Sequence, residues 1–255
     1  MLNSEAWVNY TDKDIRILEK CDEILLSKVL ECEANTSNAI KYLDLGILPI
    51  RYEIMRRKLA FLQYLLQQDK ESMIYKILKA TNEDPSKNDF VQTCKKYLKS
   101  LDIDLSFEKI GTMSKMSWKK LLKEKTRLEA FKYLENEKLK QSKICDISYE
   151  KLEIQEYLLL GDSNPKVSKV VFKARSKTLD IKMQRKWKYE DVYCSGCLKN
   201  EESPDEILNC EKFGDNEKNV KYSWFFSDCV VTQISAAKVM MEKLKRRKEL
   251  REKIS

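Results

Sequence analysis

The 255-residue sequence contains no histidine, and this absence excludes several kinds of catalytic site. A Ser-His-Asp triad and a Cys-His pair both need an imidazole, and the common catalytic zinc sites use histidine ligands. The chain also has only five Gly and four Pro. So few turn-forming residues argue against a sandwich or barrel of many short strands, because each strand of such a fold ends in a turn.

Long apolar runs are also missing. No eighteen apolar residues occur together, and the first residues (MLNSEAWVNYTDKD) lack the apolar core of a secretory signal. We therefore expect no membrane partner, an intracellular location (nuclear or cytoplasmic) and eight reduced cysteines. Four cysteines fall in helical patterns and are expected to be buried as small apolar side chains: Cys21, Cys32, Cys94 and Cys145.

Apolar residues recur at helical spacing through most of the chain, so the sequence predicts an all-α fold. The first helix is expected to begin at Thr11, with Asp14 completing a capping box. Its apolar face is expected to comprise Ile15, Leu18, Leu25 and Val29. A short helix should end at Gly46. The other predicted helices cover residues 50–67, 70–81, 87–100, 115–140, 149–159 and 228–253.

Three successive segments are expected along the chain. Residues 1–160 form a multi-helix region, residues 161–192 a basic connector helix, and residues 193–255 a small cysteine-rich module that ends in a long basic helix. Charge supports this division. Residues 166–188 hold nine Lys or Arg against one Asp, and residues 238–253 hold eight basic against three acidic residues. Such segregation predicts a polyanionic partner.

The basic segments supply the candidate nucleic-acid-binding residues. Lysine and arginine neutralise phosphates, and interleaved aromatic side chains can stack on unpaired bases. In the alternative interpretation, the basic face is merely solvated and the aromatic residues belong to the core. The candidate aromatic residues are Phe172, Trp187 and Tyr189. The candidate basic residues are Lys169, Lys173, Arg175, Lys182, Arg185, Lys186, Lys245, Arg246, Arg247 and Lys248.

The remaining cysteines suggest a zinc site. Cys194 and Cys197 form a Cys-x-x-Cys turn, and Cys210 follows. A helix beginning at Ser203-Pro204 would place Glu206 and Cys210 on one face, so Glu206 is a candidate fourth ligand.

Two alternatives compete with this assignment of Glu206. Three residues after Ser203, Glu206 would serve equally well in a capping box, and Cys229 is a competing fourth ligand. A redox Cys-x-x-Cys is disfavoured because that motif normally follows a strand in a mixed α and β pattern.

Several segments together resemble the carboxy-terminal part of the reverse transcriptase polyprotein of LINE-like, non-LTR retrotransposons of invertebrates. In the cysteine cluster the sequence supplies Cys194, Cys197, Glu202, Ser203 and Cys210 of the family pattern, with Glu206 where the family has His. The other matching segments are NSEAW (3–7), LDLGILPIRYEIMRRKLAFLQYLL (43–66), YEKLEIQEYLL (149–159), FFSD (225–228) and AAKVMMEKLKRRKEL (236–250).

The resemblance implies a thumb-like helical region and linker, followed by the cysteine-rich module. Reverse transcriptases need paired catalytic aspartates to hold two metal ions, and the sequence has no Asp-Asp. We therefore expect a non-catalytic fragment, lying after the family's fingers and palm, that binds RNA or an RNA–DNA hybrid and no small-molecule substrate. The alternative is a helical protein-interaction or structural module, including an inert remnant of a retroelement.

Overall fold

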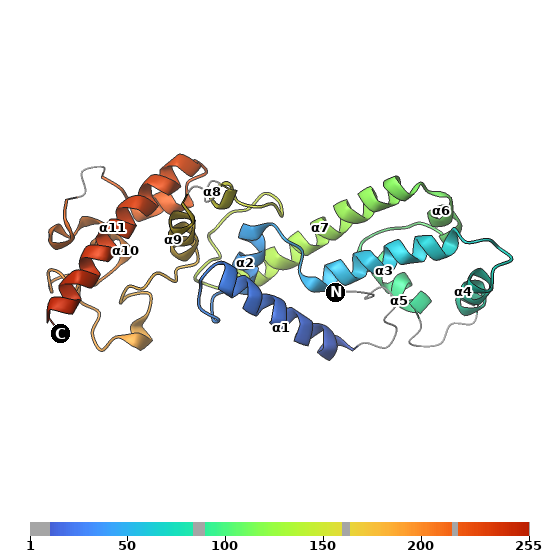
Figure 1. Ribbon diagram of the computed structural model, residues 1–255, viewed down its shortest axis with the longest axis horizontal. Helices are drawn as coiled ribbons and strands as arrows, with labels where there is room; N and C mark the ends of the chain where they lie inside the picture. Colours follow the sequence, from blue (N-terminus) through green and yellow to red (C-terminus); the bar gives the residue numbers. More distant parts are fainter. Residues whose placement is uncertain (1–10, 84–89, 160–163, 216–218, 255) are drawn as a thin grey trace. The chain divides into compact units, whose positions relative to one another are not determined.

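The computed structural model describes residues 11–83, 90–159, 164–215 and 219–254. Regular secondary structure in these ranges is helical, with eleven α-helices and no β-strand, which confirms the all-α prediction (Figure 1). Two isolated bridges, Leu45 with Ile154 and Tyr193 with Glu201, are the exceptions. The NSEAW segment (3–7) lies outside the described residues.

The chain divides into two compact units that are discontinuous in sequence. Unit 1 comprises Met1–Ile24 and Ile47–Glu135, and unit 2 comprises Leu25–Gly46 and Asn136–Ser255. The three successive segments expected from the sequence do not coincide with these units, because residues 25–46 pack with the carboxy-terminal part of the chain.

Unit 1 is built around α3 (Ile50–Leu66), which contacts the helices that follow it. Its apolar core includes Leu59 and Leu62 of α3 and the fully buried Trp118, whose indole Nε1 donates to Leu59 O at 3.0 Å. The other helices of unit 1 are α4 (Met73–Glu83), α5 (Phe90–Ser100), α6 (Phe107–Thr112) and most of α7 (Lys115–Leu139). The sequence missed α6, because Gly111 appeared to be a helix breaker.

Helix α1 (Asp12–Val29) begins with the predicted capping box. Thr11 Oγ1 accepts from the backbone N of Asp14 at 3.3 Å, and Asp14 Oδ2 accepts from Thr11 N at 2.8 Å. The predicted apolar face is wrong at the other end, where Leu25 and Val29 are exposed. Leu26 of α1 and the following Leu30 are buried in their place. The sequence carries two apolar stripes offset by one residue, and spacing alone cannot choose between them.

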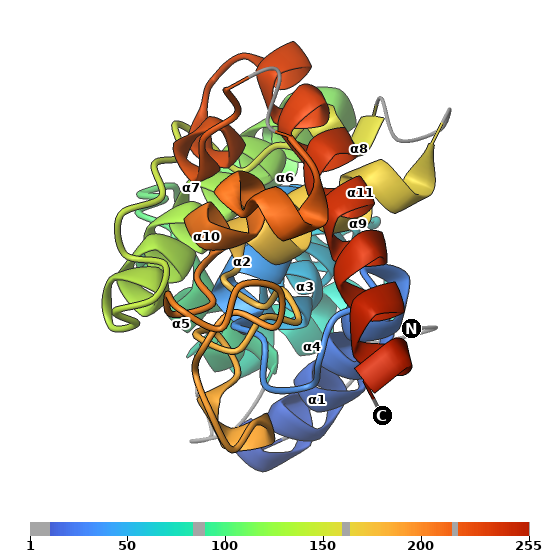
Figure 2. The ribbon, with the colours of Figure 1, turned by 90° about the vertical axis from the view of Figure 1, so that its left-hand side faces the viewer.

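Unit 2 packs short helices against the long terminal helix α11 (Val230–Ile254), which contacts α9 (Pro165–Arg175) and α10 (Pro204–Asn209) (Figure 2). Helix α2 (Asn38–Leu45) ends at Gly46, whose φ of 62° is left-handed as expected. A side chain there would also collide with the backbone, since a Cβ would lie 2.1 Å from Ile154 N.

The helix predicted over residues 149–159 is reduced to α8 (Glu156–Leu159). The residues before α8 take an irregular path, and Asp44 binds the segment 149–159 at three points. The hydroxyls of Tyr149 and Tyr157 each donate to the Asp44 carboxylate at 2.5 Å, and Gln155 N donates to Asp44 O at 2.9 Å. A continuous helix would lose this arrangement.

The four cysteines expected in the core have different environments. Cys94 of α5 is fully buried and Cys32 is half-buried, as expected for a small apolar side chain. Cys21 and Cys145 are exposed, which corrects the prediction. Cys21 lies on a solvent-facing side of α1, and Cys145 lies in a turn after α7. In the described residues, no helix is both long and apolar enough to cross a membrane.

Candidate metal centre

The Cys-x-x-Cys residues lie on a tight loop closed by backbone hydrogen bonds. Cys194 N donates to Asn200 O at 2.7 Å, and Leu198 N donates to Cys194 O at 2.9 Å. Leu198 takes a left-handed conformation with φ of 57°, which a leucine rarely adopts. Gly196 N donates to Cys194 Sγ at 3.4 Å, so the loop already directs an amide at one of its sulfurs.

Helix α10 and the residue that follows it, Cys210, supply the other two side chains of the cluster. Ser203 caps it as predicted, its hydroxyl accepting from Glu206 N at 3.0 Å, and Pro204 occupies the first turn. The Glu206 carboxylate turns toward the loop, where one oxygen lies 3.2 Å from Cys197 Sγ and the other accepts from Asn200 Nδ2 at 2.9 Å. Glu206 therefore supplies its backbone N–H to the cap and its carboxylate to the cluster.

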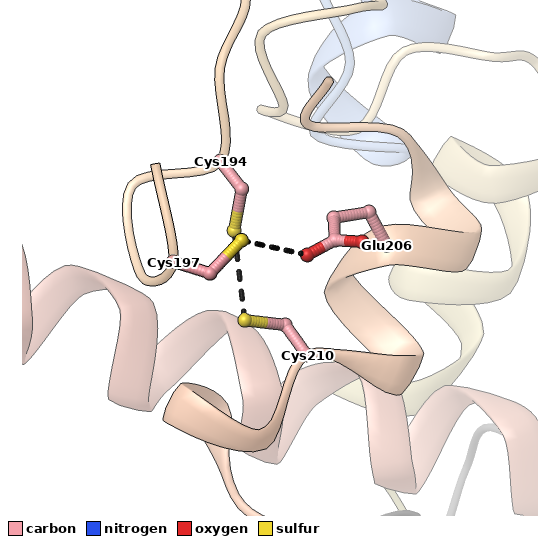
Figure 3. A group of neighbouring side chains, drawn as sticks. All are labelled: Cys194, Cys197, Glu206 and Cys210. Atoms are coloured by element: carbon pink, nitrogen blue, oxygen red, sulfur yellow. Dashed lines mark hydrogen bonds between the residues drawn. The ribbon is translucent and has the colours of Figure 1, made fainter. Parts of the chain in front are cut away.

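Cys194, Cys197, Glu206 and Cys210 converge as a group that could hold a metal ion (Figure 3). One ligand atom from each residue lies within 4.8 Å of the others, and the sulfurs of Cys194 and Cys210 are 3.7 Å apart. Cys229 is exposed at the start of α11 and does not belong to this group, so the structure favours Glu206 over Cys229 as the fourth ligand.

The protein environment shifts the pKa values of the three thiols in different directions. Burial raises the pKa of Cys194 to about 12 and also raises the pKa of Cys210. The pKa of Cys197 is lowered, because backbone N–H groups of Asn200 and Lys199 stabilise its thiolate. The cluster thus combines one thiol of lowered pKa with two of raised pKa, and a bound cation would favour the thiolate form of all three.

Sequence reasoning gave no role to Glu202, whose buried carboxylate holds the loop in place. One oxygen accepts from Arg247 Nη2 at 2.5 Å and from Lys182 N at 3.1 Å. The other accepts from Ser195 N at 3.0 Å and Ser195 Oγ at 2.8 Å. Burial opposes ionisation of Glu202, but the hydrogen bonds from Arg247 and Ser195 outweigh it and lower the pKa. Its position between the ligands Cys197 and Cys210 was the available signal.

Comparison with known proteins finds no matching family model, curated protein or solved structure.

The structure divides the predicted basic residues into two groups. Three are buried in ion pairs: Arg175 lies 3.4 Å from Asp44, Lys182 lies 2.6 Å from Asp191, and Arg247 lies 2.5 Å from Glu202. These three cannot reach a phosphate without breaking the fold, which corrects the prediction of a single exposed face. The side chain of Arg185 is also largely enclosed, 2.6 Å from Glu33, and Lys169 pairs with Glu31. The other group stays accessible: Lys173, Lys186, Lys245, Arg246 and Lys248.

The three candidate stacking residues also differ in how far their rings are exposed. Phe172 is fully buried in the core of unit 2, so it cannot stack on a base. Tyr189 donates its hydroxyl to Asp180 at 2.7 Å, and the guanidinium of Arg251 lies 4.9 Å from its ring centre. Trp187 is 71% exposed in the short 3-10 helix Lys186–Lys188. Only Trp187 of the three presents a free aromatic face.

Proposed function

We propose that the ion held by Cys194, Cys197, Glu206 and Cys210 is zinc and that it organises unit 2. A tetrahedral zinc with Zn–S bonds of about 2.3 Å places two sulfurs about 3.8 Å apart. The 3.7 Å separation of the Cys194 and Cys210 sulfurs supports this assignment. Three sulfurs and one carboxylate oxygen are ordinary zinc donors, and four protein ligands leave no open position for catalysis.

Titration of the reduced full-length protein with Zn²⁺, and with Co²⁺ as a spectroscopic substitute, tests the assignment. We expect one equivalent of metal per chain and sulfur-to-cobalt absorption. Cys210→Ser should lose most of the affinity, whereas Cys229→Ser should leave it unchanged because Cys229 lies outside the cluster. Equal metal binding by both variants, or well under one equivalent in the parent chain, would contradict the proposal.

We further propose that unit 2 binds single-stranded nucleic acid, either RNA or an RNA strand displaced from an RNA–DNA hybrid. The turn at Lys186–Lys188 carries the proposal, because it displays Trp187 between two exposed lysines. An aromatic face flanked by cations suits a base and its neighbouring phosphates. Lys245 and Lys248 of α11 add charge, and their contacts with Glu249 and Glu252 are exposed ion pairs that a phosphate can displace.

Fluorescence anisotropy with labelled RNA, DNA and hybrid duplex tests the binding. We expect saturable binding that weakens with salt, with a log–log slope of about −0.7 for each phosphate neutralised on a single strand. Changing Lys186 and Lys188 to Glu should weaken binding to every sequence and flatten the slope. Trp187→Ala should cost about 1–3 kcal/mol with little change in slope.

A matched control changes net charge equally but in unit 1. Lys119 and Lys120 are exposed on α7, and their joint replacement by Glu should leave the affinity nearly unchanged. If this variant loses as much affinity as the Lys186 and Lys188 variant, binding reflects net charge rather than the proposed turn. The absence of saturable binding at low salt would overturn the proposal.

We propose separately that this chain has no polymerase activity. The sequence has no adjacent aspartate pair to hold two metal ions. We expect no primer extension on an RNA template with Mg²⁺ or Mn²⁺. Incorporation clearly above a heat-treated control would contradict this expectation.

A second candidate function is a helical protein-interaction module. Helix α4 favours it, since Met73 is 72% exposed and Ile74 and Ile77 are also exposed. An apolar helix face of this kind suits burial against another protein surface. Sedimentation of the full chain would support this candidate if it showed self-association that Ile77→Asp abolishes.

A further inference from the structure

Helix α1 carries an exposed apolar stripe on the side opposite its packing contacts. The inner side of the helix is held by the ion pair between Glu19 and Arg51 and by the buried Leu26. The exposed residues of the outer side are apolar, and they are Ile17 (55% exposed), Cys21, Ile24 (49%) and Leu25 (57%). Several large apolar side chains exposed in one row mark a surface that another molecule covers.

The stripe ends in one acidic and one basic residue. Its positions depend only on α1 itself, which is one unbroken helix (Figure 1). Successive residues of an α-helix are turned by about 100°, so an arc of about 100° on the outer side of α1 takes in the four apolar residues and two charged ones. The charged residues are Asp14 at the start of the stripe and Lys28 at its end, and both are exposed.

This pattern is complementary to itself when a second copy of α1 runs antiparallel. A two-fold axis at Cys21 brings together residues that lie equally far before and after Cys21. Ile17 and Leu25 lie four residues to either side of Cys21, so each packs against the other across the axis. Asp14 and Lys28 lie seven residues to either side, so opposite charges meet at both ends of the stripe. A parallel pair would instead set Asp14 beside Asp14 and Lys28 beside Lys28.

We infer that α1 docks antiparallel on α1 of a second copy of this chain, so that the protein forms a homodimer. Burial of the stripe supplies the attraction, and the charges at its two ends set the direction of the pairing. An interface made of one helix from each copy is small, so we expect a dissociation constant of about 1–100 µM. This dimer needs neither the metal nor nucleic acid, so it is independent of the functions proposed above.

Sedimentation equilibrium of the reduced full-length protein, over about 1–200 µM, tests the dimer. We expect a monomer–dimer equilibrium. Ile17→Asp places a charge in the stripe of both copies and should weaken the dimer at least about a hundredfold. Ile77→Asp is the matched control, because Ile77 of α4 is 57% exposed against 55% for Ile17, and it should leave the dimer intact. Equal far-UV circular dichroism of the two variants excludes a folding defect.

Each other outcome of this experiment overturns the inference. A chain that stays monomeric over the whole range has no second copy on α1. A dimer that survives Ile17→Asp uses another surface. A dimer that Ile77→Asp abolishes and Ile17→Asp does not uses α4, which would support the α4 interaction surface instead.

Charge inversion tests the antiparallel direction. Lys28→Glu sets like charges at both ends of the stripe and should weaken the dimer about tenfold. Asp14→Lys should do the same with the opposite sign. Mixed in equal amounts, the two variants again have opposite charges at both ends and should form a heterodimer of about the parental affinity. In a parallel dimer Lys28→Glu would only exchange one pair of like charges for another, so an unchanged affinity of Lys28→Glu would overturn the inference.

Crosslinking at Cys21 tests the position of the two-fold axis. The axis brings the Cys21 side chains of the two copies together, within reach of a short bismaleimide. A chain carrying Cys145→Ser and Cys229→Ser lacks the other exposed cysteines and should give a crosslinked dimer. The yield should fall on dilution below the dissociation constant and vanish with Cys21→Ser. An equal yield from the same chain carrying Ile17→Asp would mean random collision and would overturn the assigned axis.

Discussion

The two units bury very different amounts of charge. Among the described residues, unit 1 has one buried charged side chain, Lys58, besides the uncharged polar residues Gln63 and Thr126. Unit 2 buries eight: Lys41, Asp44, Lys138, Arg175, Lys182, Glu202, Lys243 and Arg247. An apolar core tolerates many substitutions of similar size, whereas a buried charge needs its specific partner. We therefore expect unit 2 to be the more sensitive to single changes.

The largest expected loss of stability comes from disrupting the metal centre. Structural zinc contributes about 10–16 kcal/mol of apparent binding free energy in small domains, so Cys194→Ser should loosen residues 190–230. Unit 1 contains none of the four ligands and should keep its structure. Hydrogen exchange measured by mass spectrometry should show fast amides in residues 190–230 and unchanged protection in α3. Equal loss of protection in both units would abolish the distinction between them.

Breaking the Glu202–Arg247 pair is the next largest test. Arg247→Met leaves the buried Glu202 carboxylate without its strongest donor and should cost unit 2 about 3–5 kcal/mol in urea unfolding. Adding Glu202→Leu removes the orphaned charge and should recover much of that loss, although Ser195 then loses its acceptor. In unit 1, Leu59→Ala should cost about 2–5 kcal/mol. If the double variant is less stable than Arg247→Met alone, the unpaired charge of Glu202 is not the cause of the lost stability, and the expected difference between the two units is contradicted.

Acid should destabilise unit 2 through the same carboxylate. The pKa of Glu202 is lower in the folded chain than its ordinary value of 4.5. The stabilisation from its ionised form is therefore complete above pH 4.5 and is lost as the pH falls toward the lower folded pKa. The free energy of unfolding of unit 2 should decrease over that window. Glu202→Gln, which does not titrate, should be less stable at neutral pH and show a flatter acid limb.

Lys58 gives a smaller effect in unit 1, where the charged form of the buried group is destabilising, whereas the charged form of Glu202 is stabilising. Burial lowers the pKa of Lys58 below its ordinary value of 10.5. The unfolded chain then binds more protons, so stability rises as the pH increases through the folded pKa toward 10.5. Lys58→Met should be neutral or stabilising by about 1 kcal/mol at pH 7 and should remove this rise. A clear destabilisation would show that unit 1 depends on its buried cation as unit 2 depends on Arg247.

The smallest effect is expected at Leu198. Its left-handed backbone costs a leucine about 1–2 kcal/mol, and its side chain is exposed, so Leu198→Gly removes strain without losing packing. The greater entropy of glycine in the unfolded chain offsets about 0.5–1 kcal/mol. The net change in unfolding free energy should be a stabilisation below about 1 kcal/mol. Leu198→Ala, which keeps the strain, should not stabilise the loop.

The sequence predicted well what depends on nearby residues. The caps at Thr11 and Ser203 and the turn at Gly46 are set by neighbours within a few positions. The ligands on one loop and one short helix are similarly local. Prediction from the sequence failed for Arg175 and Arg247, which were expected on an exposed basic face but are buried against acidic partners 131 and 45 residues away. A basic residue looks the same in sequence whether it faces water or a distant carboxylate.

Asp44 has a consequence for the order in which the protein forms during synthesis. Its side chain binds Tyr149, Tyr157 and Arg175, which leave the ribosome 105, 113 and 131 residues later. At about 5–20 residues per second, Arg175 is synthesised roughly 7 to 26 s after Asp44. All of Ile47–Glu135 is made during this delay. Unit 1 can therefore complete its core during translation, whereas unit 2 cannot close until most of the chain has emerged.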